Sequence, residues 1–133
     1  MIKSPFLKFE SSAFVQSTRD VEDTNPGVYS KALALWLAEQ LRRRGLSAGE
    51  VVIEDFGWCV FPIESKPRRL HVVCTLFGDK QDSWQVFDFI EEALMNRLLH
   101  KDTGTDSLSA LFTIIKQVLQ SAPTVKDLRE EES

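Results

Sequence analysis

Two acids, a glycine, a tryptophan and a cysteine stand together in the segment IEDFGWCVF, residues 53–61. Glu54 and Asp55 are the residues best suited to acid–base chemistry, because carboxylates can exchange protons with a substrate. Adjacent side chains on a strand point to opposite faces, so these two would cooperate only if the chain bends at Phe56-Gly57. The pattern therefore favours an acidic turn over a catalytic pair.

The thiols and imidazoles follow no catalytic or metal-binding pattern. The sequence has no Cys-x-x-Cys motif, and His71 and His100 are too far apart for a local metal site. His71 is three residues from Cys74, which places the two side chains on opposite faces of a strand. We expect Cys59 and Cys74 to be free thiols that pack as small hydrophobic residues, and we predict no catalytic residue, no metal and no cofactor.

Composition narrows the class of protein further. A chain of 133 residues that is 43% hydrophobic can bury a core, and we expect one domain over residues 1–133. The net charge of −4 and the shortness of the basic clusters argue against a nucleic-acid binder. No apolar run reaches the roughly 18 residues of a membrane span, and no secretory signal is present. The sequence predicts a cytoplasmic protein without nucleic-acid or membrane partners.

One long helix is predicted over residues 29–44. Asn25-Pro26-Gly27 before it forms a turn, or Asn25 caps the helix with the proline at its first position. Arginines 42–44 fall in the last turn, Gly45 follows in the position of a C-terminal cap, and Leu46 is placed for the accompanying hydrophobic contact. The apolar residues that recur at helical spacing are Tyr29, Leu33, Trp36, Leu37 and Leu41.

Short apolar runs separated by turn-like segments follow the helix, and they predict an antiparallel meander of three to four strands. The runs are residues 51–53, 58–63, 70–77 and 84–90. A symmetric hairpin about Lys66-Pro67 places six side chains on one face of the sheet. The predicted pairs are Ile63–Leu70, Phe61–Val72 and Cys59–Cys74. The other face carries Trp58, Val60, Val73 and Phe77, so both faces are apolar and both need cover.

The rest of the chain contains weaker signals. Residues 5–15 contain one or two short strands, and two further helices are expected over residues 91–100 and 106–122. Asp106 or Ser107 is expected to cap the last helix. Its predicted buried stripe is Leu108, Leu111, Phe112, Ile115 and Leu119.

The predicted architecture is α+β, with the long helix first, then the meander, then C-terminal helices packed on the sheet. Pro123 ends the last helix. The tail from about residue 124 to 133 is acidic and expected to be frayed, unless residues 125–128 add an edge strand.

Three segments together resemble a group of small, largely uncharacterised bacterial cytoplasmic proteins. The segments are NPG at residues 25–27, LALWL at 33–37 and EDFGWC at 54–59, and the likeness covers roughly residues 20–80. Small acidic α+β proteins of this type are similar to immunity proteins, which neutralise a toxin delivered by a neighbouring bacterium. The resemblance implies tight protein binding without catalysis.

A binding surface for such a partner is expected at two acidic segments. Acids there would steer a basic toxin domain towards the protein, and an aromatic ring beside them would anchor it. The predicted interface residues are Glu54, Asp55, Phe56 and Trp58 in the first segment and Asp20, Glu22 and Asp23 in the second.

Other functions stay open at this point. Secretion chaperones are similar in length, acidity and α/β order and usually form dimers, although this chain lacks a leucine-rich amphipathic helix at its N-terminus. A small enzyme with an assembled acid–base site around Glu54, Asp55 and His71 is a second alternative. A homodimeric scaffold is a third.

Overall fold

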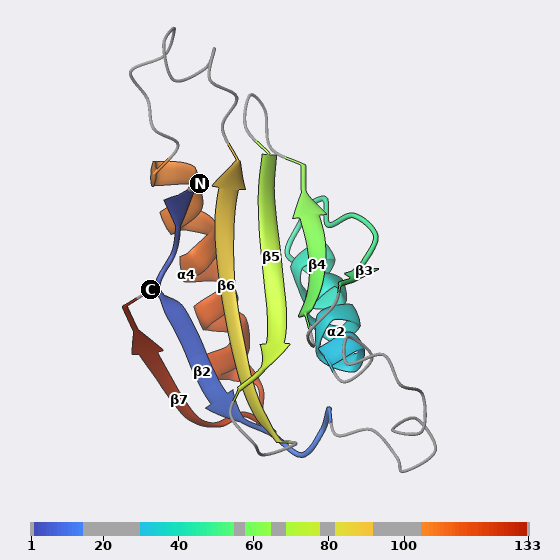
Figure 1. The fold of residues 1–133 in the computed structure, drawn as a ribbon, viewed down its shortest axis with the longest axis vertical. Helices are drawn as coiled ribbons and strands as arrows, with labels where there is room; N and C mark the ends of the chain where they lie inside the picture. The colour runs from blue at the N-terminus through green and yellow to red at the C-terminus, as the bar shows by residue number, and fades with distance from the viewer. Residues whose placement is uncertain are drawn as a thin grey trace, which may run out of the picture.

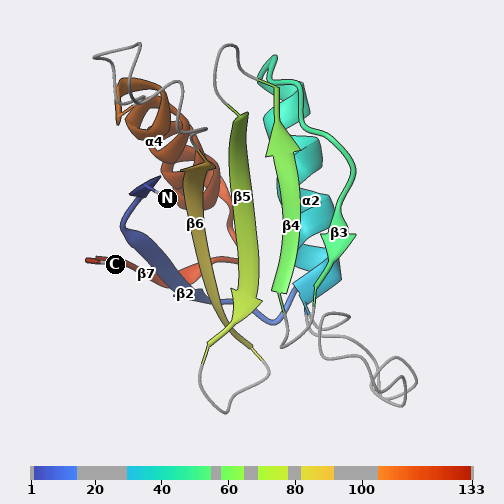
Figure 2. The ribbon, with the colours of Figure 1, turned by 45° about the horizontal axis from the view of Figure 1, so that its top comes forward.

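Seven antiparallel strands form one sheet, and two helices cover one of its faces (Figures 1 and 2). The computed structural model describes residues 2–14, 30–54, 58–64, 69–77, 82–91 and 105–132, and these counts refer to them. The elements are β1 (Ile2–Lys3), β2 (Phe6–Glu10), α2 (Lys31–Arg43), β3 (Val52–Ile53), β4 (Trp58–Ile63), β5 (Arg69–Leu76), β6 (Ser83–Glu91), α4 (Thr105–Ser121) and β7 (Lys126–Glu131). The strand order is β3-β4-β5-β6-β2-β7, and β1 also pairs with β6.

The predicted α+β class is confirmed, but the predicted order of elements is wrong. Strands β1 and β2 precede α2, and β2 lies in the sheet between β6 and β7. Leu7 and Phe9 are buried there, because the alternating run FLKFE turns these two side chains towards the helices. β2 is held in the sheet by pairing with β6 and β7, which lie more than 70 residues away in the sequence. A local pattern of residues does not reveal such distant pairing, so the sequence does not predict this order.

The meander has the predicted register. The pairs Ile63–Leu70, Phe61–Val72 and Cys59–Cys74 align between β4 and β5. All six side chains are buried on the face covered by α2 and α4, which we call the core face. β6 continues the alternation, since Val86 and Ile90 lie opposite Cys74 and Leu70.

Helix α2 ends in the predicted glycine cap. Gly45 has a φ of 88°, its N–H donates to the Arg42 carbonyl at 3.0 Å, and the Leu46 N–H donates to the Leu41 carbonyl at 3.1 Å. These two bonds define a Schellman motif, and Leu46 packs on the core as expected. The described helix starts at Lys31 with Ser30 before it, so the predicted roles of Asn25 and Pro26 lie outside the described residues.

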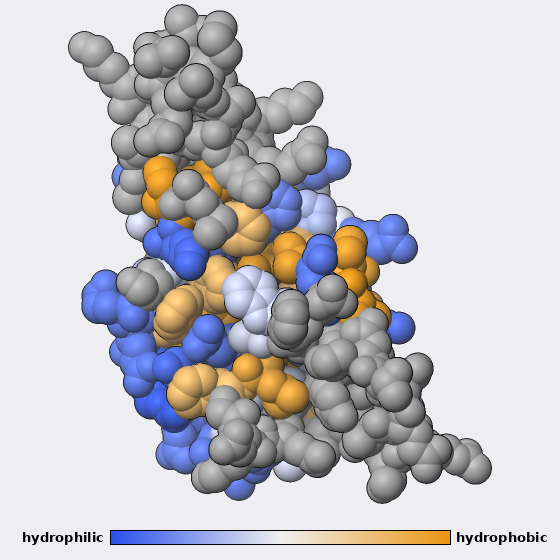
Figure 3. All heavy atoms as spheres, viewed as in Figure 1, coloured by the Kyte–Doolittle hydropathy of each residue, from blue (hydrophilic) through white to orange (hydrophobic). Residues whose placement is uncertain are grey.

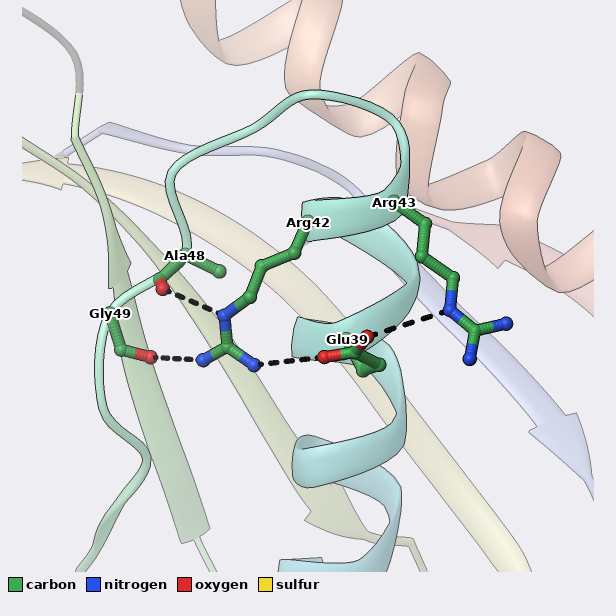
Figure 4. A network of polar contacts seen from close by, with 5 residues as sticks. All are labelled: Glu39, Arg42, Arg43, Ala48 and Gly49. Atoms are coloured by element: carbon green, nitrogen blue, oxygen red, sulfur yellow. Dashed lines mark hydrogen bonds and ion pairs between the residues drawn. The ribbon is translucent and has the colours of Figure 1, made fainter.

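The arginines at the end of α2 fix the connection to β3 (Figure 4). Arg42 donates from Nε to the Ala48 carbonyl at 3.1 Å and from Nη2 to the Gly49 carbonyl at 3.2 Å. Glu39 lies 3.5 Å from both Arg42 and Arg43. Part of the basic cluster is therefore engaged within the fold.

The predicted stripe of buried residues on helix α4 is mostly confirmed, but its predicted N-terminal cap is wrong. Leu108, Leu111, Ile115 and Leu119 are buried, while Phe112 is half-buried. The helix begins at Thr105, so Asp106 and Ser107 lie in its first turn and neither precedes it. Polar residues are common both at the N-cap and in the first turn of a helix, so the sequence does not distinguish the two positions. The helix expected over 91–100 falls outside the described residues beyond Glu91, which ends β6.

The C-terminal segment forms the edge strand β7 and is not frayed up to Glu131. β7 pairs antiparallel with β2, and the register shifts by one residue between Lys8 and Glu10. Asp127 sits at this irregularity with a φ of 55°, a conformation that aspartate tolerates better than most residues. The alternative that placed an edge strand near residues 125–128 is the correct one.

Gly45→Ala is expected to destabilise the fold by about 1 kcal/mol, because a Cβ is unfavourable at positive φ. Beyond the adjacent residues, no heavy atom lies within 4 Å of the position that the new methyl group would occupy, so the cost is confined to the backbone. Urea unfolding followed by circular dichroism measures this difference. Ser47→Ala, an exposed change in the same loop, is the matched control, and equal midpoints for both variants would contradict the motif's role.

Candidate functional site

The sheet has a second apolar face on the side away from the helices, which we call the open face. No helix or strand of the described ranges lies over it (Figures 1 and 2). Side chains that alternate with the core set point to it from β2, β4, β5 and β6. Its apolar members include Phe6, Trp58, Val73, Phe77, Phe87 and Phe89. Figure 3 shows the same side of the molecule, with hydrophobic surface interrupted by hydrophilic side chains.

Three aromatic rings form the centre of the open face. Phe87 is only 3% exposed although neither of the two described helices lies on this side of the sheet. The rings of Phe6 and Trp58 contact it edge-to-face at centroid distances of 5.1 and 5.9 Å. Such edge-to-face pairs each add about 0.5–1.5 kcal/mol beyond simple burial. The cluster therefore protects its own centre and leaves its outer rings accessible.

Two rings on this face remain exposed. Trp58 is 40% exposed at the start of β4, and Phe77 is 37% exposed just after β5. The Glu54 N–H donates to the Trp58 carbonyl at 2.8 Å, so two of the predicted interface residues, the exposed Glu54 and Trp58, lie side by side. The other predicted interface residues, Asp55, Phe56, Asp20, Glu22 and Asp23, lie outside the described residues.

Lysines on β1 and β2 add positive charge that was not predicted from the sequence. The Lys8 ammonium lies 3.9 Å from the centroid of the Phe77 ring and also pairs with Glu131 of β7. The hydrogen bond from Lys8 lowers the pKa of Glu131. The Lys3 ammonium lies 5.9 Å from the centroid of Phe87. The alternation of FLKFE places Phe6 and Lys8 on one face, and this signal was available in the sequence.

The alternative acid–base site is not assembled from its described members. Glu54 lies next to Trp58, which pairs with Thr75, and His71 is four residues further along β5. At about 3.3 Å per residue this separates Glu54 from His71 by roughly 13 Å. The His71 ring instead stacks on Phe89, with centroids 4.9 Å apart. Within the described ranges, no three His, Cys, Asp or Glu side chains are grouped closely enough to hold a metal ion.

The two cysteines are cross-strand partners on the core face, away from His71. Both are buried, and neither forms a disulfide. Burial raises the pKa of Cys59, and a hydrogen bond with Ser30 and the charge of Lys31 oppose this shift in part. Burial also raises the pKa of Cys74 well above its ordinary value, with Cys59 adding to the effect.

Among the described residues, two small pockets that are partly open to solvent border the helices. The larger, about 300 Å³, lies where the C-terminal ends of α2 and α4 meet and is lined by residues that include Trp36, Arg44 and Thr124. The smaller, about 190 Å³, separates the segment Ile2–Pro5 from α4 residues Leu108, Ser109 and Phe112. Neither α2 nor α4 is long and apolar enough to cross a membrane.

The fold defines an α+β protein whose antiparallel sheet has one face packed on helices and one face lined with aromatic side chains. Comparison of the chain with protein-family models, with curated proteins and with solved structures gave no match. The chemistry of the two sheet faces is therefore the remaining indication of function.

Both thiols are expected to react slowly with an alkylating reagent in the native state, because the reactive thiolate is disfavoured by burial. Intact-mass spectrometry at pH 8 measures the rate. Ser47→Cys supplies an exposed thiol as the internal control and is expected to react at least about tenfold faster. Equal rates for all three thiols would contradict the burial of Cys59 and Cys74.

Proposed function

We propose that this protein is a non-enzymatic protein-binding module that grips its partner through the open face. The observation that carries this proposal is the exposure of Trp58 and Phe77 on an apolar sheet face over which no described helix or strand lies (Figure 1). Tryptophan is one of the residue types that most often contribute a large share of the binding energy in protein interfaces. The ring cluster around Phe87 supports Trp58 from behind, so its ring is held in place before binding.

The partner class that we propose is a toxin domain whose basic site faces the Trp58 end of the open face, where Glu54 lies, while the charge of Lys8 is balanced by Glu131. Glu54 lies at the rim beside Trp58, and the chain carries a net charge of −4. Rim acids raise the association rate with a basic partner, while a desolvated aromatic centre provides most of the affinity. Toxin neutralisation is also the role implied by the resemblance of the segments NPG, LALWL and EDFGWC to immunity-like proteins.

The secretion-chaperone alternative would also use the open face, with a second copy as the occupant. Apolar residues on both sides of one sheet suit a symmetric dimer as well as a foreign partner. Sedimentation velocity separates the two: a toxin-binding monomer sediments as about 15.2 kDa, whereas a chaperone-like dimer has twice this mass.

Trp58→Ala combined with Phe77→Ala is expected to weaken partner binding by about 30-fold or more, because truncated anchor residues cost about 2 kcal/mol or more. The partner to test first is the product of the gene adjacent to the one that encodes this chain. Growth of a laboratory bacterium that expresses this product measures neutralisation, and calorimetry measures affinity. Leu35→Ala is the matched control, since Leu35 is 50% exposed on α2, away from the open face.

Wild-type protein that neither binds this product nor restores growth would contradict toxin neutralisation. Binding that survives the double substitution unchanged, with the fold intact by circular dichroism, would contradict the open face as the interface.

Glu54→Lys combined with Asp55→Lys tests the acidic rim separately. We expect slower association with a basic partner and little change in thermal unfolding, because Glu54 is exposed. Stopped-flow kinetics at low and high salt measures the effect, which salt should reduce. An association rate that is the same as for the wild type at low salt would remove these acids from the interface.

A further inference from the structure

Asp88 is an acid in an apolar environment. It lies on the core face of β6 between Val86 and Ile90, opposite Val72 of β5, and it is wholly buried. No donor in the described part of the chain makes a hydrogen bond of ordinary geometry to either of its carboxylate oxygens. Buried polar groups are nearly always bonded, so the ionised form of a carboxyl without such bonds is unfavourable at this place in the sheet.

The backbone of Asp88 holds the N-terminal segment in place. The Ser4 N–H donates to the Asp88 carbonyl at 2.8 Å, and the Asp88 N–H donates to the Ser4 hydroxyl oxygen at 3.0 Å. The Ser4 hydroxyl in turn donates to the Pro5 carbonyl at 3.0 Å. Ser4 links β1 to β2, and β1 pairs with β6 at Ile2–Ile90 and Lys3–Phe89. Ser4 and Asp88 thus form a clasp that keeps β1 on the sheet.

The clasp borders on a pocket at the edge of the helical layer. The pocket of about 190 Å³ lies between Ile2–Pro5 and the first turns of α4, with Ser4 in its wall. This volume gives water a place to enter when the segment moves. Hydration of the Asp88 carboxyl therefore needs only a local displacement of β1 and Ser4.

No charge in the described part of the chain faces Asp88 to stabilise its ionised form. Its neighbours on β5 and β6 are apolar, and α4 contributes Leu108, Leu111 and Ile115 to the core. The charged groups nearby are directed elsewhere. Asp106 is exposed, Lys116 bonds Glu130 at 3.0 Å, and Lys3 lies over Phe87 on the open face.

Burial raises the pKa of Asp88 to about 7, and the nearby Ser4 hydroxyl and its own backbone N–H offset only part of this shift. The closed state is the one in which β1 and Ser4 cover Asp88. Because the pKa of Asp88 is raised in this state, the protonated carboxyl favours it over an open state, and this contribution is complete below the ordinary pKa of 3.8. This contribution is lost as the pH rises through about 7.

We propose that Ser4 and Asp88 form a pH-sensitive latch that releases β1 from β6 when the Asp88 carboxyl loses its proton. The neutral acid stays buried and the clasp is closed. The ionised carboxylate requires water, and opening of β1 and Ser4 is the smallest movement that admits it. Release leaves backbone groups of β6 near Phe89 and Ile90 without their strand partner, which creates a strand edge for another chain. The latch does not depend on the proposed toxin-binding function.

Nuclear magnetic resonance of the full chain tests the latch directly. Carbon-detected titration is expected to give Asp88 a midpoint near pH 7. Hydrogen-exchange protection factors of the Ser4 and Asp88 amides are expected to fall about tenfold between pH 6 and pH 8.5, once corrected for intrinsic exchange. The Val73 and Phe87 amides, in the middle of the sheet, should keep theirs.

Two variants separate the latch from general instability. Asp88→Asn removes the charge with almost no change of shape, so the protection at residues 4 and 88 should become independent of pH. Asp82→Asn, next to the start of β6, is the matched control and should behave as the wild type. An Asp88 midpoint near pH 4, unchanged protection of Ser4 in the wild type, or the same pH dependence in Asp88→Asn would each overturn the proposal. The wild-type titration decides the question even if Asp88→Asn does not fold.

Discussion

The rest of the structure depends on the register of the central strands β4, β5 and β6. Side chains alternate between the two faces of a strand, so the alignment of Cys59 with Cys74 and of Val73 with Phe87 assigns every neighbouring side chain to a face. A slip of one residue in β4 would turn Phe61 to the open face and drive Trp58 towards α2. The core, the separation of His71 from the thiols and the aromatic cluster all follow from this one alignment.

A sheet that is apolar on both faces but covered by helices on one must stabilise its other face in a different way. Here Phe87 is shielded by the edges of neighbouring rings, and lysines from β1 and β2 lie over Phe87 and Phe77. A cation over a ring contributes about 0.5–1 kcal/mol at exposed sites, and its aliphatic stem covers apolar surface. These contacts stabilise the open face without closing it, which leaves Trp58 and Phe77 accessible.

Local patterns predicted the parts of the fold that neighbouring residues determine. These parts are the strands of the meander, the hairpin register and the glycine cap at Gly45. Each depends on a segment of fewer than 20 residues, so the neighbouring residues are enough to predict it. The positions of β2 and β7 were not predicted in the sheet, because both result from pairing between distant segments. Asp88 was overlooked although it falls at a core position of the alternation that runs from Val86 to Ile90. Of the seven residues predicted for the interface, Glu54 and Trp58 are described and lie side by side, whereas the lysines were not predicted because the sequence pattern gave β1 and β2 no position in the sheet.

The edges of the sheet bear on the proposed use of its open face. β7, at one edge, carries charged residues and an irregularity at Asp127, both of which discourage a further strand from pairing. At the other edge, the Gly49 N–H bonds the Pro62 carbonyl at 2.8 Å and the Glu64 N–H bonds the Ser47 carbonyl at 3.0 Å. A Cβ at Gly49 would lie 2.6 Å from Pro62 Cγ, so this close cover of β4 requires glycine. β7 and the C-terminal end of β4 are therefore protected against pairing with a further strand, which is consistent with the proposed use of the open face.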